Sequence, residues 1–128
     1  MLEEVTTDDI LARFILEREK FSPVNNAVKF RAFLPNPRGE LSVFVITGWT
    51  EEKIWQVGQE FVATPQGKSL EARGDVSASV IWASNLSIDL DNAPPGHANV
   101  LGWPDKSEQK AIAIKLAQAA KLVIFPGN

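Results

Sequence analysis

The sequence predicts a single α+β domain, in which a mixed and mostly antiparallel sheet of about four to six strands packs against two or three helices. The length of 128 residues fits one domain, and 45% hydrophobic with 23% charged residues is an ordinary globular composition. Apolar residues recur at helical spacing in some segments and alternate, or run continuously, in others. No linker or low-complexity stretch separates these segments, so we expect residues 1–128 to form one domain.

Two segments in the first half of the chain have the apolar spacing of helices. The first predicted helix covers residues 8–20. Its apolar face would be formed by Ile10, Leu11, Phe14 and Ile15. The second predicted helix covers residues 51–63, with Thr50 as its N-cap and acidic residues in its first turn.

Two further helices are predicted in the second half of the chain. Residues 77–85 indicate a short helix capped by Ser77. The last helix is expected to begin after Pro104, because Asp105 and Glu108 have the spacing of a capping box.

The strand signals begin with two apolar segments in the first half of the chain. Residues 28–34 alternate apolar and other side chains, and residues 41–47 are apolar on both faces and rich in β-branched residues. A turn-forming stretch with two prolines and a glycine separates them, which predicts an antiparallel hairpin with a long loop. Further strands are expected at residues 70–76, 86–91, 98–103 and 122–125.

The converging periodicities of helices and strands predict one shared core. Its members would include Ile54, Val57, Phe61, Leu116, Val43 and Val45. The apolar segment at residues 122–125 should be paired inside the sheet, because an exposed apolar strand invites association with other chains.

Composition and charge restrict the partners and the compartment that can be expected. The chain has no cysteine, and its N-terminus is acidic where a secretory signal would be basic and then apolar, which predicts a cytoplasmic protein. No apolar run approaches the roughly 20 residues that cross a bilayer, so no membrane association is expected. The net charge of −3 and the absence of a basic run make nucleic acid an unlikely partner.

His97 is the strongest candidate for chemistry, because it is the only histidine and lies in a loop of prolines and glycine. Arg73 and Asp75 lie on one face of a predicted strand, where they could orient the imidazole and bind an anion. If the protein has a catalytic site, we expect His97, Arg73 and Asp75 to form it and to meet in the structure. The alternative for Arg73 and Asp75, which the sequence favours, is an ordinary surface ion pair at a strand end. Arg31 and Asn99 are added as binding residues, Asn99 because it should point to the same side as His97.

Trp103 is a further candidate binding residue. Both Trp49 and Trp103 follow a glycine at a strand-to-helix junction, where an indole either closes the core or lines a pocket. Of the two roles, the sequence favours the core. The repeated Gly-Trp junction could reflect a duplication, but the rest of the two halves aligns poorly, so we favour coincidence.

No metal or cofactor is expected. Asp89 and Asp91 resemble the start of a calcium loop, but the positions that need a glycine and a glutamate hold proline and valine. A looser metal site formed by Asp89, Asp91 and His97 is conceivable, but we do not favour it. Phosphate-binding glycine loops and the Gly-x-Ser-x-Gly motif are absent from the sequence.

Three classes of function are compatible with these residues. The first is a small cytoplasmic binding module for an unknown protein partner or a small anionic ligand. The second is a small metal-independent transferase or hydrolase of an anionic substrate, with His97 as acid and base and Arg73 as anion clamp. The third is a nucleic-acid binder or a ribonuclease-type toxin, which the charge disfavours.

Overall fold

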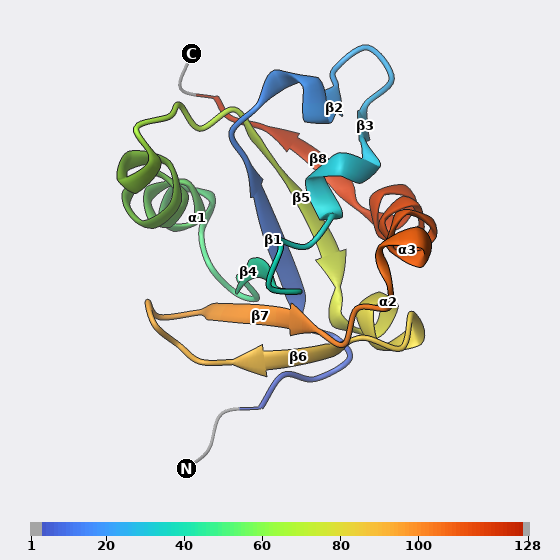
Figure 1. The fold of residues 1–128 in the computed structure, drawn as a ribbon. Coiled ribbons are helices and arrows are strands. Elements are labelled where there is room, and N and C mark those ends of the chain that lie inside the picture. Colours follow the sequence, from blue (N-terminus) through green and yellow to red (C-terminus); the bar gives the residue numbers. More distant parts are fainter. Residues whose placement is uncertain (1–3, 127–128) are drawn as a thin grey trace.

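In the computed structural model, which describes residues 4–126, a six-stranded sheet lies between helices that cover both of its faces (Figure 1). Every pair of neighbouring strands is antiparallel, in the order β6-β7-β4-β1-β5-β8. The strands are β1 (Ile10–Ile15), β4 (Leu41–Val45), β5 (Ala72–Ser77), β6 (Ser87–Leu90), β7 (His97–Leu101) and β8 (Lys121–Ile124). A separate two-stranded sheet pairs β2 (Phe21–Ser22) with β3 (Ala27–Val28). The predicted α+β class, strand number and mostly antiparallel pairing are confirmed.

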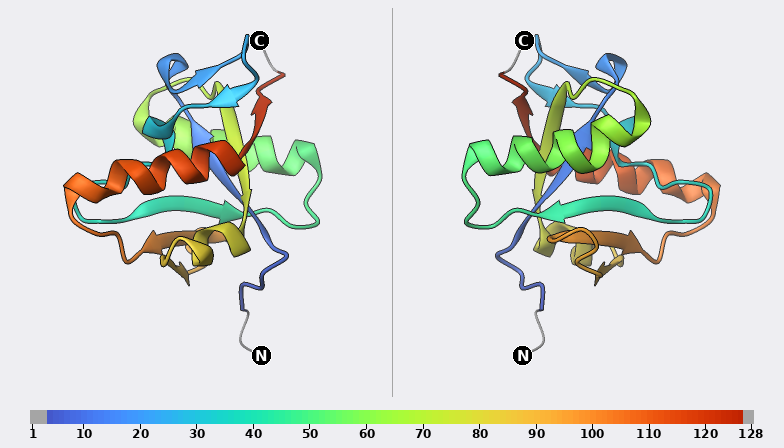
Figure 2. Two further views of the ribbon diagram at one scale, coloured as in Figure 1. Left: turned by 90° about the vertical axis from the view of Figure 1, so that its right-hand side faces the viewer. Right: turned by 90° about the vertical axis from the view of Figure 1, so that its left-hand side faces the viewer.

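The sheet divides the interior into two apolar layers. Helices cover both of its sides (Figure 2). One face is covered by α1 (Glu51–Gly58) and the π-helical turn Gln59–Ala63 that continues it. The other face is covered by α2 (Ala78–Ala83), α3 (Lys106–Ala119) and a 3₁₀ segment, Phe30–Phe33. None of the helices in the described part of the chain is long and apolar enough to cross a membrane.

The predicted helix at residues 8–20 is wrong, because residues 10–15 form β1 in the interior of the sheet. β1 is paired on both sides, and side chains from both of its faces are buried, such as Leu11 on one and Phe14 on the other. A strand that is apolar on both faces has no alternation, so its spacing resembled that of a helix. Asp9, expected in the first helical turn, instead accepts hydrogen bonds from the Thr6 amide and the Thr47 hydroxyl, each at 2.8 Å.

The predicted hairpin between residues 28–34 and 41–47 is also wrong. β4 exists as expected, but its neighbours are β1 and β7, and residues 30–33 form the 3₁₀ segment that packs on α3. The consecutive residues Ala32 and Phe33 are both buried, which a period-two strand on a single core does not allow.

The later elements follow the predictions closely. Thr50 caps α1 by accepting a hydrogen bond from the Lys53 amide at 3.1 Å, and the expected strands β5 to β8 and helices α2 and α3 are present. β8 is paired with β5, which confirms that the apolar end of the chain joins the sheet. Ser77 and Asp105 occupy N-cap positions, but neither side chain caps its helix, so the predicted capping box is absent.

The predicted single core is wrong because the sheet separates its members. Ile54 and the partly buried Val57 pack under α1. Leu116, Val43 and the partly buried Val45 pack on the opposite face, beside α3. Successive residues of β4 point to opposite faces, so Val43 and Val45 share the face away from α1 and cannot contact the helix that follows them in sequence.

β1 and β4 separate soon after they meet, and the sheet opens between them. In the described part of the chain their register holds only two pairs, Leu11 with Val45 and Ala12 with Phe44. Beyond these pairs β1 continues along β5, while β4 continues along β7 at a steep angle to β1 (Figure 2). The opening exposes residues from the middle of the sheet and, as described below, contains the candidate site.

A pair of phenylalanines tests this distribution of burial. Phe33 is fully buried, so Phe33→Ala should lower the free energy of unfolding by about 3–5 kcal/mol. Phe61, which we expected in the core, is 41% exposed, because the π-helical turn rotates it away and directs Ala63 inward. Phe61→Ala should therefore cost less than about 1 kcal/mol in the same denaturant titration. Equal losses for the two variants would contradict the assignment.

Candidate active site

A serine, a histidine and an aspartate form a continuous series of hydrogen bonds beside the opening of the sheet. The hydroxyl of Ser42 lies 2.7 Å from Nε2 of His97, and Nδ1 of His97 lies 2.8 Å from Oδ1 of Asp91. These are short hydrogen bonds, and this order of groups is the one used to activate a serine hydroxyl as a nucleophile.

The sheet itself brings Ser42 and His97 together. β4 and β7 are paired so that Phe44 is opposite His97 and Ser42 is opposite Asn99. Ser42 and His97 are therefore diagonal neighbours on one face, where side chains can reach each other. The ring of Phe44 packs edge-on against the imidazole with 5.3 Å between the ring centres, which limits the positions open to His97.

Asp91 is held against His97 by the loop between β6 and β7. The amides of Asp91 and Asn92 donate to the carbonyl of His97 at 3.2 and 3.0 Å, and the amide of Ala93 donates to Asp91 Oδ1 at 3.1 Å. Gly96 closes the loop with a φ of +88°, and a Cβ there would lie 2.7 Å from Trp49. Both observations require glycine at position 96.

The electrostatics favour an ionised Asp91. Burial raises the pKa of this carboxyl, but hydrogen bonds from His97 and from the Ala93 amide outweigh burial and leave the pKa below its usual value. A carboxylate can only accept hydrogen bonds, so the proton of the neutral imidazole belongs on Nδ1. Nε2 is then the acceptor for the Ser42 hydroxyl, as a general base must be.

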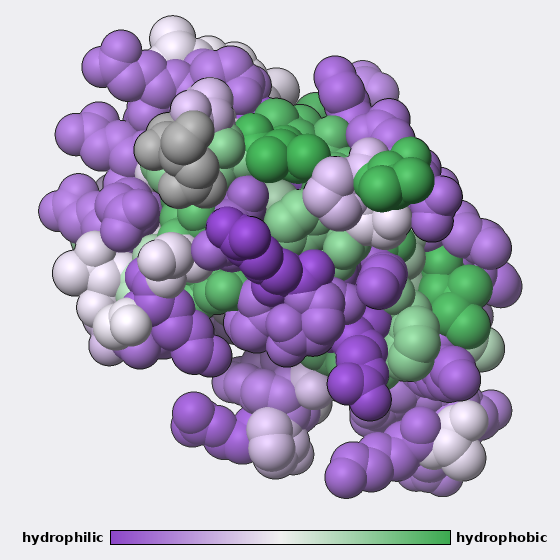
Figure 3. Space-filling view, turned by 90° about the horizontal axis from the view of Figure 1, so that it is seen from above, coloured by the Kyte–Doolittle hydropathy of each residue, from purple (hydrophilic) through white to green (hydrophobic). Residues whose placement is uncertain are grey.

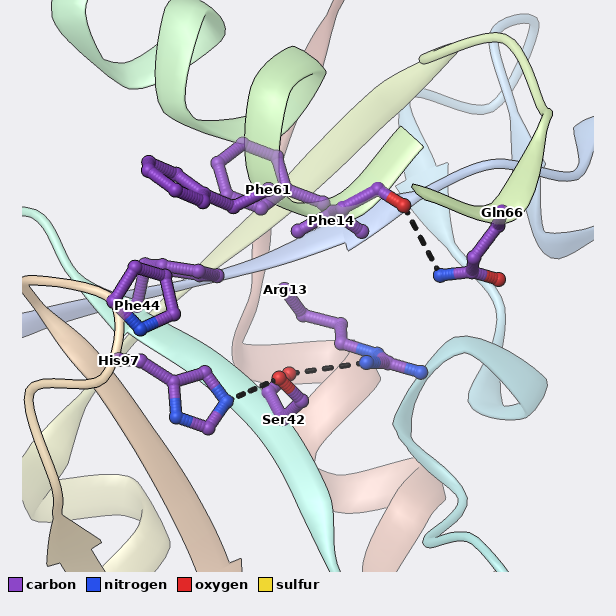
Figure 4. Close-up of a pocket in the computed structure, with 9 residues that line it drawn as sticks. Arg13, Phe14, Ser42, Phe44, Phe61, Gln66 and His97 are labelled. Atoms are coloured by element: carbon purple, nitrogen blue, oxygen red, sulfur yellow. Dashed lines mark hydrogen bonds between the residues drawn. The ribbon is translucent and has the colours of Figure 1, made fainter. Parts of the chain in front are cut away.

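A small cavity of about 190 Å³ opens beside Ser42 and His97 (Figure 4). Its lining is mixed, and the apolar side chains around it are Phe14, Phe44, Phe61, Val62 and Pro94. The polar groups in its wall are Ser42, His97, Arg13 and Gln66. A pocket that combines apolar walls with a few convergent polar groups is the usual form of a small-molecule site.

Arg13 lies in the opening where β1 and β4 separate. Its Nε donates to the carbonyl of Ala32 at 2.8 Å, and a terminal nitrogen donates to the carbonyl of Ser42 at 3.0 Å, a contact drawn in Figure 4. Both partners are neutral, and no ion pair of Arg13 occurs within residues 4–126. Burial lowers the pKa of this guanidinium, and the charge of Glu17 only partly opposes the effect.

The expected meeting of His97 with Arg73 and Asp75 does not occur. Their strands, β7 and β5, are separated by β4 and β1, and three strand spacings amount to about 14 Å. Arg73 is instead engaged by Asp75 at 2.9 Å and by Glu51 at 2.8 Å. Arg73 is only 2% exposed. The guanidinium that we expected to bind a ligand is therefore buried and already bound by two carboxylates.

The three predicted binding residues lie in different places. Asn99 is close to His97, because its side-chain amide donates to the second oxygen of Asp91 at 3.3 Å. Arg31 is exposed and lines a cleft on the side of the 3₁₀ segment. Trp103 packs against the α3-side core and donates to the carbonyl of Val100 at 3.0 Å, which places it in the core rather than at this site.

No sequence pattern predicted a role for Ser42 or Arg13, or the hydrogen bond between Asp91 and His97. A serine within an apolar strand carries no signal of its own, and Arg13 was assigned to a helix that does not exist. Asp91 was considered only as a calcium or metal ligand. Within residues 4–126 no group of three or more acidic or imidazole side chains is placed to hold a metal ion.

Comparisons of this chain with protein-family models, with curated proteins and with solved structures found no match. Interpretation of the site therefore rests on its geometry.

Arg73 allows a test of its structural assignment. Burial raises the pKa of Asp75, which Arg73 only partly offsets, so removal of the guanidinium leaves a buried carboxylate without its partner. Arg73→Met should lower the free energy of unfolding by about 3–5 kcal/mol. Arg18→Met removes a guanidinium that is 79% exposed and paired with Glu71, so it should cost less than about 1 kcal/mol. A loss for Arg73→Met as small as that for Arg18→Met, in urea titrations, would show that the pair is not structural.

Proposed function

We propose that this protein is a small hydrolase of ester bonds, in which Ser42 is the nucleophile, His97 is the general base and acid, and Asp91 orients the imidazole. The observation that carries the proposal is the unbroken series of hydrogen bonds from Ser42 to Asp91, at 2.7 and 2.8 Å. The proposal keeps the catalytic role predicted for His97 and replaces Arg73 and Asp75 as its neighbours.

The proposed reaction follows from the position of each proton. Oγ of Ser42 attacks the ester carbonyl carbon while its proton passes to Nε2 of His97. The bond to the leaving oxygen then breaks, and that oxygen takes the proton from the imidazolium and departs as an alcohol. Water attacks the acyl group on Ser42 and gives a proton to Nε2, and the acid leaves as that proton returns to Oγ.

Arg13 and the apolar wall supply the remaining parts. Arg13 lies in the cavity wall beside Ser42, so its positive charge would stabilise negative charge close to the reacting bond. The phenylalanine rings around the cavity suit an apolar acyl group of modest size. The absence of cysteine supports a reducing, cytoplasmic setting for this chemistry.

One observation favours the binding module as a second candidate. A groove of about 470 Å³ runs between β3, the 3₁₀ segment and α3, and its apolar residues are Val28, Phe30, Ile114 and Ala117. Figure 3 shows hydrophobic side chains reaching the surface between hydrophilic ones at the end of the molecule that carries β2 and β3. A groove of this kind could hold an apolar ligand without any reaction.

The hydrolase is tested with a short-chain aryl ester and an active-site label. The wild-type protein should hydrolyse p-nitrophenyl butyrate, and Ser42→Ala or His97→Gln should lower kcat/KM by about a thousandfold or more. A fluorophosphonate should label Ser42, as located by mass spectrometry of the digested protein. Ser87→Ala, which removes an exposed serine on β6, should behave as wild type.

The proposal is overturned if Ser42→Ala retains turnover, if the label attaches to another residue, or if the folded wild-type protein neither turns over the ester nor takes up the label. Near-ultraviolet circular dichroism of each variant establishes that its fold is intact. In the last case a binding role would be the better description of the protein.

A further inference from the structure

A second, wider cleft shares Ser42 with the cavity. Its volume is about 700 Å³, and it lies between the end of β1, the start of β4 and the segment from the 3₁₀ turn to residue 40. Ser42, Arg13 and Gln66 line both the cavity and this cleft. A single bound molecule could therefore occupy both compartments with its reacting bond at the Ser42 hydroxyl.

Cations dominate the charged groups of this cleft, although the chain as a whole has a net charge of −3. Arg13, Lys20 and Arg31 line it, together with one carboxylate, Glu40. Lys20 is partly neutralised by Glu17, at 2.8 Å. For the Arg31 side chain, neither an ion pair nor a hydrogen bond occurs within residues 4–126.

Arg13 has the strongest need for an anion. Its side chain is partly buried, and its two hydrogen bonds go to the carbonyls of Ala32 and Ser42, which carry no net charge. A guanidinium has five N–H groups, so about three remain for another acceptor. A poorly solvated cation gains most from a carboxylate or phosphate that binds it through charge-assisted hydrogen bonds.

We propose that this cleft binds the anionic group, a carboxylate or a phosphate, on the leaving part of the ester that Ser42 attacks. The substrate would then be an ester with a compact apolar acyl group in the cavity and an acidic leaving group held by Arg13, Lys20 and Arg31. The inference rests on the proposed function for the identity of the reacting bond, but the binding of an anion by these three residues can be measured without catalysis.

A small anion fits the cleft better than a nucleic acid does. Glu17 and Glu40 lie beside the cations and would repel an extended phosphate chain, while a single acidic group can contact Arg13 between them. The lysines and arginines are scattered along the sequence and form no basic run of the kind that nucleic-acid binding needs.

The first experiment measures anion binding in the Ser42→Ala protein, where no reaction can occur. Inorganic phosphate and benzoate are titrated separately, and amide shifts near Arg13 and Arg31 are followed by NMR at low ionic strength. At least one of the two anions should bind, and the stronger one identifies the acidic group. Arg31→Gln and Lys20→Gln in the same background should each weaken binding by about tenfold.

Matched control substitutions separate a site from general attraction. Arg38→Gln removes an exposed arginine of the same loop that does not line the cleft, and it should leave affinity within about twofold of the parent. Equal weakening by Arg38→Gln and Arg31→Gln, or no binding of either anion, would overturn the cleft assignment. Preferential binding of a single-stranded oligonucleotide over both small anions would also overturn it.

The second experiment joins the cleft to the reaction. The butyryl ester of 4-hydroxybenzoate is compared with the butyryl ester of methyl 4-hydroxybenzoate, each rate being normalised to spontaneous hydrolysis of that ester. The wild-type protein should prefer the carboxylate by about tenfold in kcat/KM, and Arg31→Gln should remove the preference. Hydrolysis of both esters without preference would reject the inference and leave the hydrolase intact, whereas anion binding without any hydrolysis would reject the hydrolase and leave the anion site.

Discussion

Arg13 fills the space where β1 and β4 separate, and its guanidinium donates to the carbonyls of Ala32 and Ser42. A buried carbonyl at the side of a sheet needs a donor, and the neighbouring strand normally supplies it. Here β1 and β4 pair through only two residues each, so a side chain takes over that task. The candidate site depends on this use of a side chain in place of a neighbouring strand. It leaves an opening within the sheet that is lined by backbone, by Ser42 and by Arg13, which has no ion pair within residues 4–126. Arg13 and Ser42 line both the small cavity beside His97 and the charged cleft.

The groups proposed for chemistry come from the half of the sheet formed by β4, β7 and β6. Ser42 and His97 belong to the paired strands β4 and β7, and Asp91 belongs to the loop that joins β6 to β7, so adjacent hydrogen bonds fix all three. Rigid strands hold catalytic groups more accurately than long loops do. The other half of the sheet has a structural charge cluster of its own, in which Arg73 binds Glu51 and Asp75 and packs over the ring of Trp55. Similar residue types therefore stabilise the fold in one half and face the candidate site in the other.

Much of the fold could be predicted from the sequence, but the site could be predicted only in part. Composition and the periodicity after Thr50 predicted the fold class and most later elements, because most of those helices and strands bury a single face. β1 was mistaken for a helix, since a strand buried on both faces lacks alternation. His97 stood out as the only histidine in a constrained loop. Ser42 could not stand out, because its role arises from the pairing of β4 with β7, which no local pattern in the chain encodes.

The central claim is that Ser42, His97 and Asp91 form one series of hydrogen bonds, and the most direct test of it is to measure which nitrogen of the neutral imidazole carries the proton. The chain has one histidine, so the long-range ¹H–¹⁵N spectrum of the ring nitrogens contains one set of signals and needs no assignment. With Asp91 accepting from Nδ1 and Ser42 donating to Nε2, the neutral ring should carry its proton on Nδ1. Asp91→Asn should change the populations of the two tautomers, because an amide can donate as well as accept. A ring protonated on Nε2 in the wild-type protein, or one that exchanges freely between tautomers, would contradict the arrangement on which the proposed chemistry depends.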